Sequence, residues 1–309
     1  MNKLTKLGLT AVAGSLVASS AYAGALDVSG SASIKFKSDD DDEVTGNSYS
    51  MGKGISFSGS GEMDNGFTMS YSYTMTNAAF SSQNIMLDMG DGGSIGLGNG
   101  ASGAGLRTVR YLLPTAGEEA WDDTDTDDNG LAQHSDTNAV YYNGNFAGFG
   151  VSAAYVQDTG GSDHSIALKY GGLMDGLTLV YGFGEDGETV DLQTYGVQYT
   201  MGSVSAAYQK SERDNTGSTA DEESTGLGVS IAVNENMSIS YNVWDVDMDT
   251  ALDEESTGIS ASYTMGSMKF VGVSNETENV AGSAGDDTFR EISVTVSYTH
   301  LTLPTILLV

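Results

Sequence analysis

The sequence has no cysteine, only two prolines, and 12 lysines and arginines against 42 aspartates and glutamates. The lack of cysteine excludes a disulfide framework and thiol chemistry. The formal net charge of −30 argues against nucleic acid as a partner, because phosphate binding requires a basic surface. Histidine is equally scarce. His134, His164 and His300 have no neighbours at the spacing of a catalytic triad or a zinc site, so we expect no enzyme.

Long apolar runs are also missing. The body of the chain has no run of about 18 apolar residues, which argues against a transmembrane helix. The first 23 residues instead resemble a secretory signal: Lys3 and Lys6 precede the apolar stretch 7–17, and Ala21-Tyr22-Ala23 forms a small-x-small cleavage site. We therefore interpret residues 1–23 as a signal peptide and expect the protein to leave the cytoplasm.

Apolar and polar residues alternate along much of the chain. Within 26–37, apolar residues such as Val28, Ile34 and Phe36 alternate with serine, aspartate and lysine, and a period of two is typical of a β-strand with two different faces. The same pattern recurs in sixteen segments, approximately 26–37, 48–63, 66–76, 83–89, 94–99, 138–143, 148–157, 163–171, 176–184, 190–201, 203–211, 224–233, 237–245, 256–265, 267–275 and 288–298. One face of these segments is apolar, and the other carries mainly serine, threonine, glutamine, aspartate and lysine.

The connections between these segments alternate in kind. Short turns rich in glycine and asparagine, such as 64–66 and 234–236, alternate with longer acidic loops, such as 212–223 and 247–255. Short turns at one end and long loops at the other are typical of outer-membrane barrels, as are apolar outward and polar inward faces. We therefore predict an all-β, transmembrane antiparallel β-barrel of about 16 strands in the bacterial outer membrane, embedded in its lipid.

One connection is much longer than the rest. The stretch 101–137 contains Pro114, Trp121 and the acidic run 122–128. A long insertion in a compact β protein is usually functional or disordered. We expect this stretch to fold into the lumen and to narrow a water-filled pore. Its charged residues are the candidates for setting ion selectivity: Glu118, Glu119, Asp122, Asp123, Arg107 and Arg110. The excess of acids predicts a preference for cations, unless the loop lies outside the pore.

The same stretch contains a calcium-like pattern. Asp125, Asp127 and Asn129 alternate, Gly130 follows, and Asp136 falls where a twelfth-position ligand would be. No helices are expected around it, and aspartate replaces the usual glutamate. Ca²⁺ bound by acidic loops is therefore an expectation, with no cofactor required for function.

The chain resembles the general diffusion porins of Gram-negative bacteria, particularly the alphaproteobacterial type. The resemblance covers nearly the whole chain after the signal and depends on the order and spacing of four motifs and on the long loop after the fifth strand. These motifs are Val28-Ser29-Gly30-Ser31-Ala32, Phe57-Ser58-Gly59, Asp64-Asn65-Gly66-Phe67 and Gly92-Gly93-Ser94-Ile95-Gly96-Leu97-Gly98. It implies a 16-stranded barrel, usually a homotrimer, that passes small hydrophilic solutes and ions by diffusion.

The resemblance also implies that basic residues on the wall face the loop acids across the constriction. Lys35 and Lys37 are the candidates, with Lys169 less certain. Residues 24–299 would form the barrel, with 101–137 as the constriction loop. Porins of this type usually end in an aromatic residue, whereas here 300–309 continues past the expected final strand. We interpret that tail as non-native, a divergent C-terminus being the alternative.

Two other functions remain open at this stage. A secreted, acidic, calcium-binding β-protein, such as an adhesin or a surface-layer module, would be soluble and would need calcium to fold. A channel specific for sugars or phosphate would need binding groups that the sequence does not identify, and the scarcity of basic residues argues against phosphate.

Overall fold

The structure, a computed structural model, describes residues 26–39, 48–99, 103–124, 138–158, 161–187, 189–216, 221–248 and 251–299. The expected signal peptide and the tail 300–309 lie outside these residues. No helix in the described ranges is long and apolar enough to cross a membrane.

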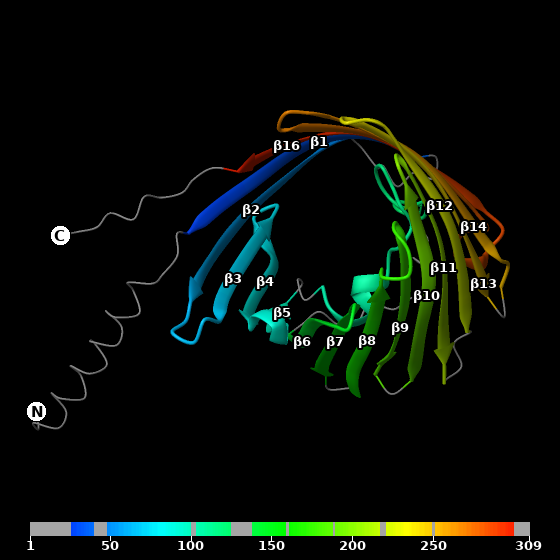
Figure 1. Ribbon diagram of the computed structural model, residues 1–309. Helices are drawn as coiled ribbons and strands as arrows, with labels where there is room; N and C mark the ends of the chain where they lie inside the picture. The colour runs from blue at the N-terminus through cyan, green and yellow to red at the C-terminus, as the bar shows by residue number, and fades with distance from the viewer. Residues whose placement is uncertain are drawn as a thin grey trace, which may run out of the picture.

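Sixteen antiparallel strands form one closed barrel, in which each strand pairs with its neighbours in the sequence and β1 pairs with β16 (Figure 1). The strands are β1 (Asp27–Asp39), β2 (Tyr49–Glu62), β3 (Thr68–Thr76), β4 (Ala79–Asp88), β5 (Ser94–Asn99), β6 (Ala139–Phe146), β7 (Phe149–Asp158), β8 (Gly161–Tyr170), β9 (Leu177–Asp186), β10 (Val190–Met201), β11 (Val204–Asn215), β12 (Glu222–Asn234), β13 (Met237–Met248), β14 (Glu254–Met265), β15 (Met268–Glu278) and β16 (Asp286–Thr299). Within the described ranges, three short 3₁₀ helices accompany them, η1 (Gly90–Gly92), η2 (Gly105–Val109) and η3 (Val280–Gly282). The predicted all-β barrel of sixteen strands is confirmed, and its longest connection follows the fifth strand, as expected.

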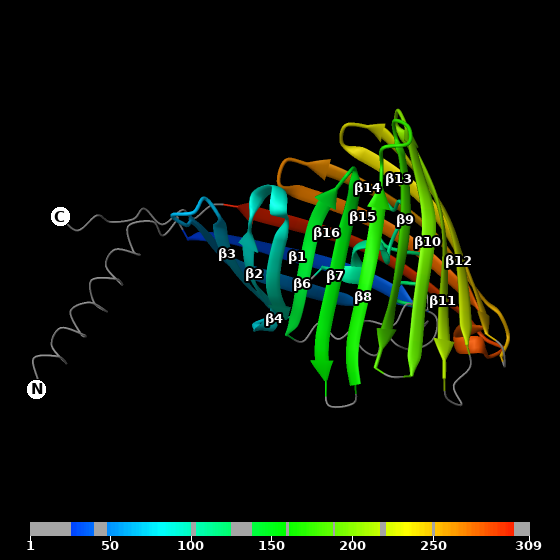
Figure 2. The ribbon, with the colours of Figure 1, turned by 60° about the horizontal axis from the view of Figure 1, so that its bottom comes forward.

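Local sequence explains the tight turns at one end of the barrel. The side chains of Asn65, Asp88 and Asn234 each accept a hydrogen bond from the backbone N–H two residues further on. This Asx geometry turns the chain without help from the rest of the fold. Gly202 and Gly266 each have a φ of 62°, in the left-handed region that two-residue hairpins require. The strands from β6 to β12 run side by side between the two ends (Figure 2).

The outer face of the barrel is apolar and exposed. Ile34, Ile292 and Tyr298 expose 58%, 64% and 67% of their surface, and they occupy the face that the alternation assigned to the outside. Large apolar side chains exposed on nearly every strand have no partner in the barrel itself, so they need an apolar medium around them. A hydrocarbon layer supplies that medium, as in other membrane barrels.

The inner face differs from one side of the barrel to the other. Strands β8 to β15 each place two to four buried residues at alternate positions along part of their length, whereas β2, β3 and β4 have none. Something must therefore cover the inner wall from β8 to β15 and leave it open along β2 to β4. The covering element is the segment 103–124. Figure 1 shows its short helix η2 on the inside of the curved wall, beside β8 and β9.

Candidate functional site

The segment 103–124, here called the inner segment, begins against β7 and β8. The backbone N–H of Gly105 donates to Ser152 Oγ at 2.7 Å, and the N–H of Leu106 donates to Ser165 Oγ at 2.9 Å. The first N–H groups of a helix have no partner within it, so the two serines satisfy donors that would otherwise be buried. The hydroxyls of the wall therefore attach the start of the segment.

Gln209 on β11 holds the middle of the inner segment. Its side-chain oxygen accepts from the N–H of Leu112 at 3.0 Å, and its nitrogen donates to the carbonyls of Val109 and Arg110, each at 2.9 Å. The side chain is completely buried. A fully bonded buried amide fixes the position of the loop, because losing any of these bonds would leave a polar group unsatisfied.

The last part of the inner segment is attached to β13, β14 and β15. The N–H groups of Ala116 and Gly117 donate to the hydroxyls of Ser240 and Ser260, each at 2.8 Å. Asn275 then donates to the carbonyls of Glu119 and Asp122 at 2.9 and 3.0 Å. The inner segment thus follows the wall from β7 to β15 and is bonded along its length.

Apolar packing accompanies these hydrogen bonds. A buried cluster joins residues of the inner segment to residues of the wall: Leu106, Val109, Leu112, Leu113, Ala120 and Trp121 pack with Ala167, Val180, Leu192, Ala207 and Trp244. Trp121 and Trp244 meet edge to face, with their ring centroids 4.6 Å apart. The inner face is therefore not uniformly polar. Beneath the inner segment, the polar residues that the sequence assigned to the inner face share it with apolar residues such as Val180 and Trp244.

Glycines on the wall make room for the inner segment. A Cβ at Gly182 on β9 would lie 2.5 Å from Leu106 Cδ1, and a Cβ at Gly258 on β14 would lie 2.7 Å from Ala120 Cα. Both distances are shorter than van der Waals contact. The backbone of the segment can approach the sheet this closely only where side chains are missing, so these glycines shape the surface on which it lies.

The charged end of the inner segment contacts β1 and β16. Lys35 Nζ lies 3.6 Å from a carboxylate oxygen of Glu118, and Lys37 Nζ lies 2.8 Å from one of Asp123. Glu291 on β16, which is almost fully buried, lies 3.0 Å from Lys35 and 3.9 Å from Lys37. Lysines 35 and 37 thus contact loop acids directly rather than facing them across an open gap.

Replacing Glu291 by glutamine is expected to destabilise this charged cluster. The change removes the carboxylate shared by Lys35 and Lys37, leaving two neighbouring ammonium groups with less compensation. A hydrogen bond to a charged group contributes roughly 1.5–3 kcal/mol, so the free energy of unfolding in urea should fall by about that amount. The exposed Glu276→Gln on β15 is the matched control and should change little. Equal stability of Glu291→Gln and the unchanged protein would contradict this role.

The three acids Glu118, Asp123 and Glu291 lie close enough together to hold a cation, with ligand oxygens within 4.8 Å of one another. The ammonium groups of Lys35 and Lys37 already lie beside these three acids and supply the positive charge that a bound cation would supply. The predicted calcium ligands Asp125, Asp127, Asn129 and Asp136 lie outside the described residues, so calcium binding there stays a prediction.

Glu119 and Asp122 form the remaining acidic pair of the inner segment. The N–H of Glu119 donates to Asp122 Oδ2 at 3.2 Å, and the N–H of Asp122 donates to the carbonyl of Glu119 at 3.2 Å. Burial, together with a hydrogen bond and charge repulsion from Glu119, raises the pKa of Asp122 to about 7. Burial and repulsion from Glu291 also raise the pKa of Glu118. The negative charge of the inner segment therefore changes with pH near neutrality, because Asp122 gains or loses its proton there.

The remaining candidates lie elsewhere. Arg107 belongs to η2 and is half-buried, and the guanidinium of the buried Arg110 lies over the ring of Tyr111, 4.7 Å from its centroid. Lys169 on β8 is exposed and lines a cavity near the short turns, so it is not part of the charged cluster. Sequence reasoning did not identify Gln209, Asn275 and Trp244, which hold the inner segment in place.

An antiparallel barrel with an apolar outer face and a polar, segment-lined interior is typical of outer-membrane β-barrel proteins. The chain belongs to the Gram-negative porin family, which matches residues 8–300. It is thus an outer-membrane β-barrel protein, a member of a family of channels rather than enzymes.

Solved structures share the fold. A variant of the Rhodopseudomonas blastica porin is 16% identical, with a TM-score of 0.63, covering 88% of this chain and 99% of its own. A triple mutant of the same porin is 13% identical, with a TM-score of 0.62 and the same coverage. A porin refined at 1.8 Å resolution is 19% identical, with a TM-score of 0.64, covering 88% of this chain and all of its own. A comparison with curated proteins gave no match.

Proposed function

We propose that this porin is a general diffusion channel for small hydrophilic solutes and ions, narrowed by the inner segment and selective for cations. The attachment of the inner segment from β7 to β15 carries the proposal, because the inner faces of β2 to β4 stay uncovered opposite it. Solutes would diffuse through a water-filled path between the inner segment and these strands, and their passage would need no chemical step. Selection would depend on size and charge.

The charge balance supports a preference for cations. The described part of the long loop contains Glu118, Glu119, Asp122 and Asp123 against Arg107 and Arg110, and the whole chain has a net charge of −30. A lumen with low-dielectric walls focuses such a field and enriches cations over anions. Lys35 and Lys37 reduce this field locally, because they neutralise Glu118 and Asp123. The Glu119–Asp122 pair would then contribute most to selectivity.

The test is the single-channel conductance of the refolded protein in a planar bilayer under a salt gradient. We expect a reversal potential of the sign that cation selectivity requires. Conductance steps in groups of three would support a homotrimer, which the family resemblance implies. Anion selectivity would contradict the role of the loop acids. A soluble protein that folds only with calcium and forms no channel would contradict the porin function itself.

A further inference from the structure

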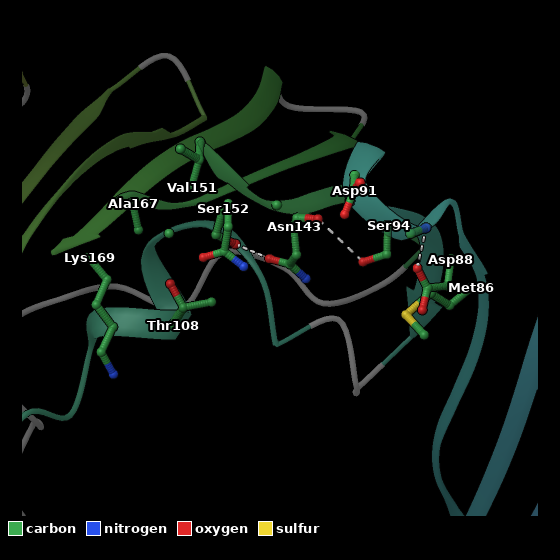
Figure 3. Close-up of a pocket in the computed structure, with 15 residues that line it drawn as sticks. Met86, Asp88, Asp91, Ser94, Thr108, Asn143, Val151, Ser152, Ala167 and Lys169 are labelled. Atoms are coloured by element: carbon green, nitrogen blue, oxygen red, sulfur yellow. Dashed lines mark hydrogen bonds between the residues drawn. The ribbon is translucent and has the colours of Figure 1, made fainter. Parts of the chain in front are cut away.

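A cavity of about 690 Å³ with a mixed polar and apolar lining lies against the inner wall at the end of the barrel with the short turns. Residues of η1 and of strands β4 to β8 line it, and Thr108 of the inner segment contributes one side (Figure 3). This volume is in the range of small-ligand sites. The cavity shares no residue with the charged cluster at β1 and β16.

Charges of opposite sign stand at the two ends of the cavity. Lys169 lies at one end, and Asp88 and Asp91 lie at the other (Figure 3). Asp88 accepts a hydrogen bond from the N–H of Gly90 at 2.9 Å, whereas no described residue pairs with the charged groups of Lys169 and Asp91. Both of these side chains are exposed to the cavity and available to a solute.

Neutral hydrogen-bonding groups fill the space between the two ends. Asn143 and Asn145 stand two residues apart on β6, so both face the cavity, and Ser94 and Ser152 flank them on β5 and β7. Ser152 donates to the side-chain oxygen of Asn143, which leaves the amide nitrogen of Asn143 free to donate. This lining offers donors and acceptors without further charge, as recognition of peptide groups requires.

The separation of the charges sets the length of a matching solute. Asp88 on β4 and Lys169 on β8 are four strand spacings apart along the wall, or roughly 19 Å at about 4.8 Å per spacing. Side chains stand roughly perpendicular to the sheet, so on this curved wall Asp88 and Lys169 converge as they extend into the lumen, and the gap between their charged groups falls to on the order of 10 Å. An extended peptide spans about 3.5 Å per residue, so three residues fit between the charges.

We propose that this cavity is a transit site for short zwitterionic peptides, with the peptide carboxylate at Lys169 and the ammonium group at Asp91 and Asp88. A simple anion would meet the aspartates, and a simple cation would meet the lysine. An uncharged sugar could bond to the amides but would use neither charge. The proposal rests on the porin function, because the peptide reaches the cavity through the pore.

The experiment uses the full-length refolded protein in a planar bilayer at pH 7, with triglycine as the probe. We expect triglycine to reduce the ion current in a saturable manner, and N-acetyl-triglycine amide, which lacks both charges, to have no such effect. Lys169→Gln should weaken the apparent affinity for triglycine about fivefold, the size expected for one partly exposed ion pair. Asp91→Asn should weaken it by a similar factor.

Lys269→Gln is the matched control. Lys269 stands four residues before the buried Val273 on β15, so it faces inward, also near the short turns but across the barrel. This change removes the same charge and should leave the affinity for triglycine unchanged. Equal effects of the two lysine variants, or equal block by the free and the capped peptide, would overturn the proposal while leaving the porin function intact. A protein that forms no channel would overturn both.

Discussion

Replacing Trp121 by alanine is expected to release the C-terminal half of the inner segment and to increase the single-channel conductance. Trp121 is buried and packs edge to face on Trp244 at 4.6 Å. Removing a buried tryptophan side chain costs about 3–5 kcal/mol, and 1.4 kcal/mol corresponds to a tenfold change in an equilibrium. The ratio of attached to released segment should therefore fall by about a hundredfold or more. The wall retains all its strand pairings, so the barrel itself should still fold.

The change also provides its own optical readout, because Trp244 becomes the only tryptophan in the chain. Its side chain is 1% exposed in the attached state, so its fluorescence should shift to the red once the inner segment leaves. Tyr241→Ala, three residues earlier on the outer face of β13, is the control and should alter neither emission nor conductance. A Trp121→Ala protein with unshifted emission and unchanged conductance would show that Trp121 does not hold the segment.

A second variant tests the same attachment from the wall. In Gly258→Val, the new Cβ would stand 2.7 Å from Ala120 Cα, so the backbone of the inner segment would have to move away. Both variants should change conductance in the same direction, although one removes an attraction and the other adds a clash. If both variants change the conductance in the same way, the cause is the displacement of the inner segment and not the loss of the tryptophan ring itself.

The barrel could be predicted from the sequence because strand periodicity is local. In β1, for example, Ile34 and Phe36 alternate with Lys35 and Lys37, and this pattern alone assigns the two faces. The turns are equally local, because Asn65 and Asn234 bond to the backbone only two residues further on. The individual strands and their two faces follow from these short-range signals, whereas the exact number of strands and the pairing of β1 with β16 do not.

The path of the inner segment could not be predicted in this way, because its partners are distant in the sequence. Leu112 bonds to Gln209, 97 residues away, and Asn275 bonds to the carbonyl of Glu119, 156 residues away. The apolar part of the inner wall is visible in the sequence as strands that are apolar on both faces. In β13, Trp244 and Val246 on one face alternate with Tyr241 and Val243 on the other, and strands covered on both faces are apolar on both.

Cation selectivity is expected to increase between pH 6 and pH 8. Since the pKa of Asp122 is raised to about 7, its carboxyl is mostly neutral at pH 6 and mostly charged at pH 8. One added charge about 5 Å from a passing ion contributes somewhat less than 1 kcal/mol through water, before screening by salt. The permeability ratio of cations to anions should therefore rise roughly twofold. The measurement is the reversal potential at each pH under a fixed salt gradient.

The same proton affects stability with a definite sign. Between the ordinary pKa of an aspartate and about 7, the folded segment binds more protons than the unfolded chain, so its stability falls as the pH rises through that window. The bonds from Asn275 limit this effect, because they go to the backbone carbonyls of Glu119 and Asp122, which do not titrate. The inner segment should stay attached while its charge changes.

Two variants distinguish this titration from a general effect of pH on the lumen. Asp122→Asn removes the titrating carboxyl, so the increase in selectivity near neutral pH should disappear. Glu119→Gln keeps that carboxyl but removes the repulsion that helps to raise its pKa, so the increase should remain and move to lower pH. A transition that persists unchanged in Asp122→Asn would assign it to another group. Loss of the transition in one variant and its displacement in the other would identify Asp122 as the group through which pH controls selectivity.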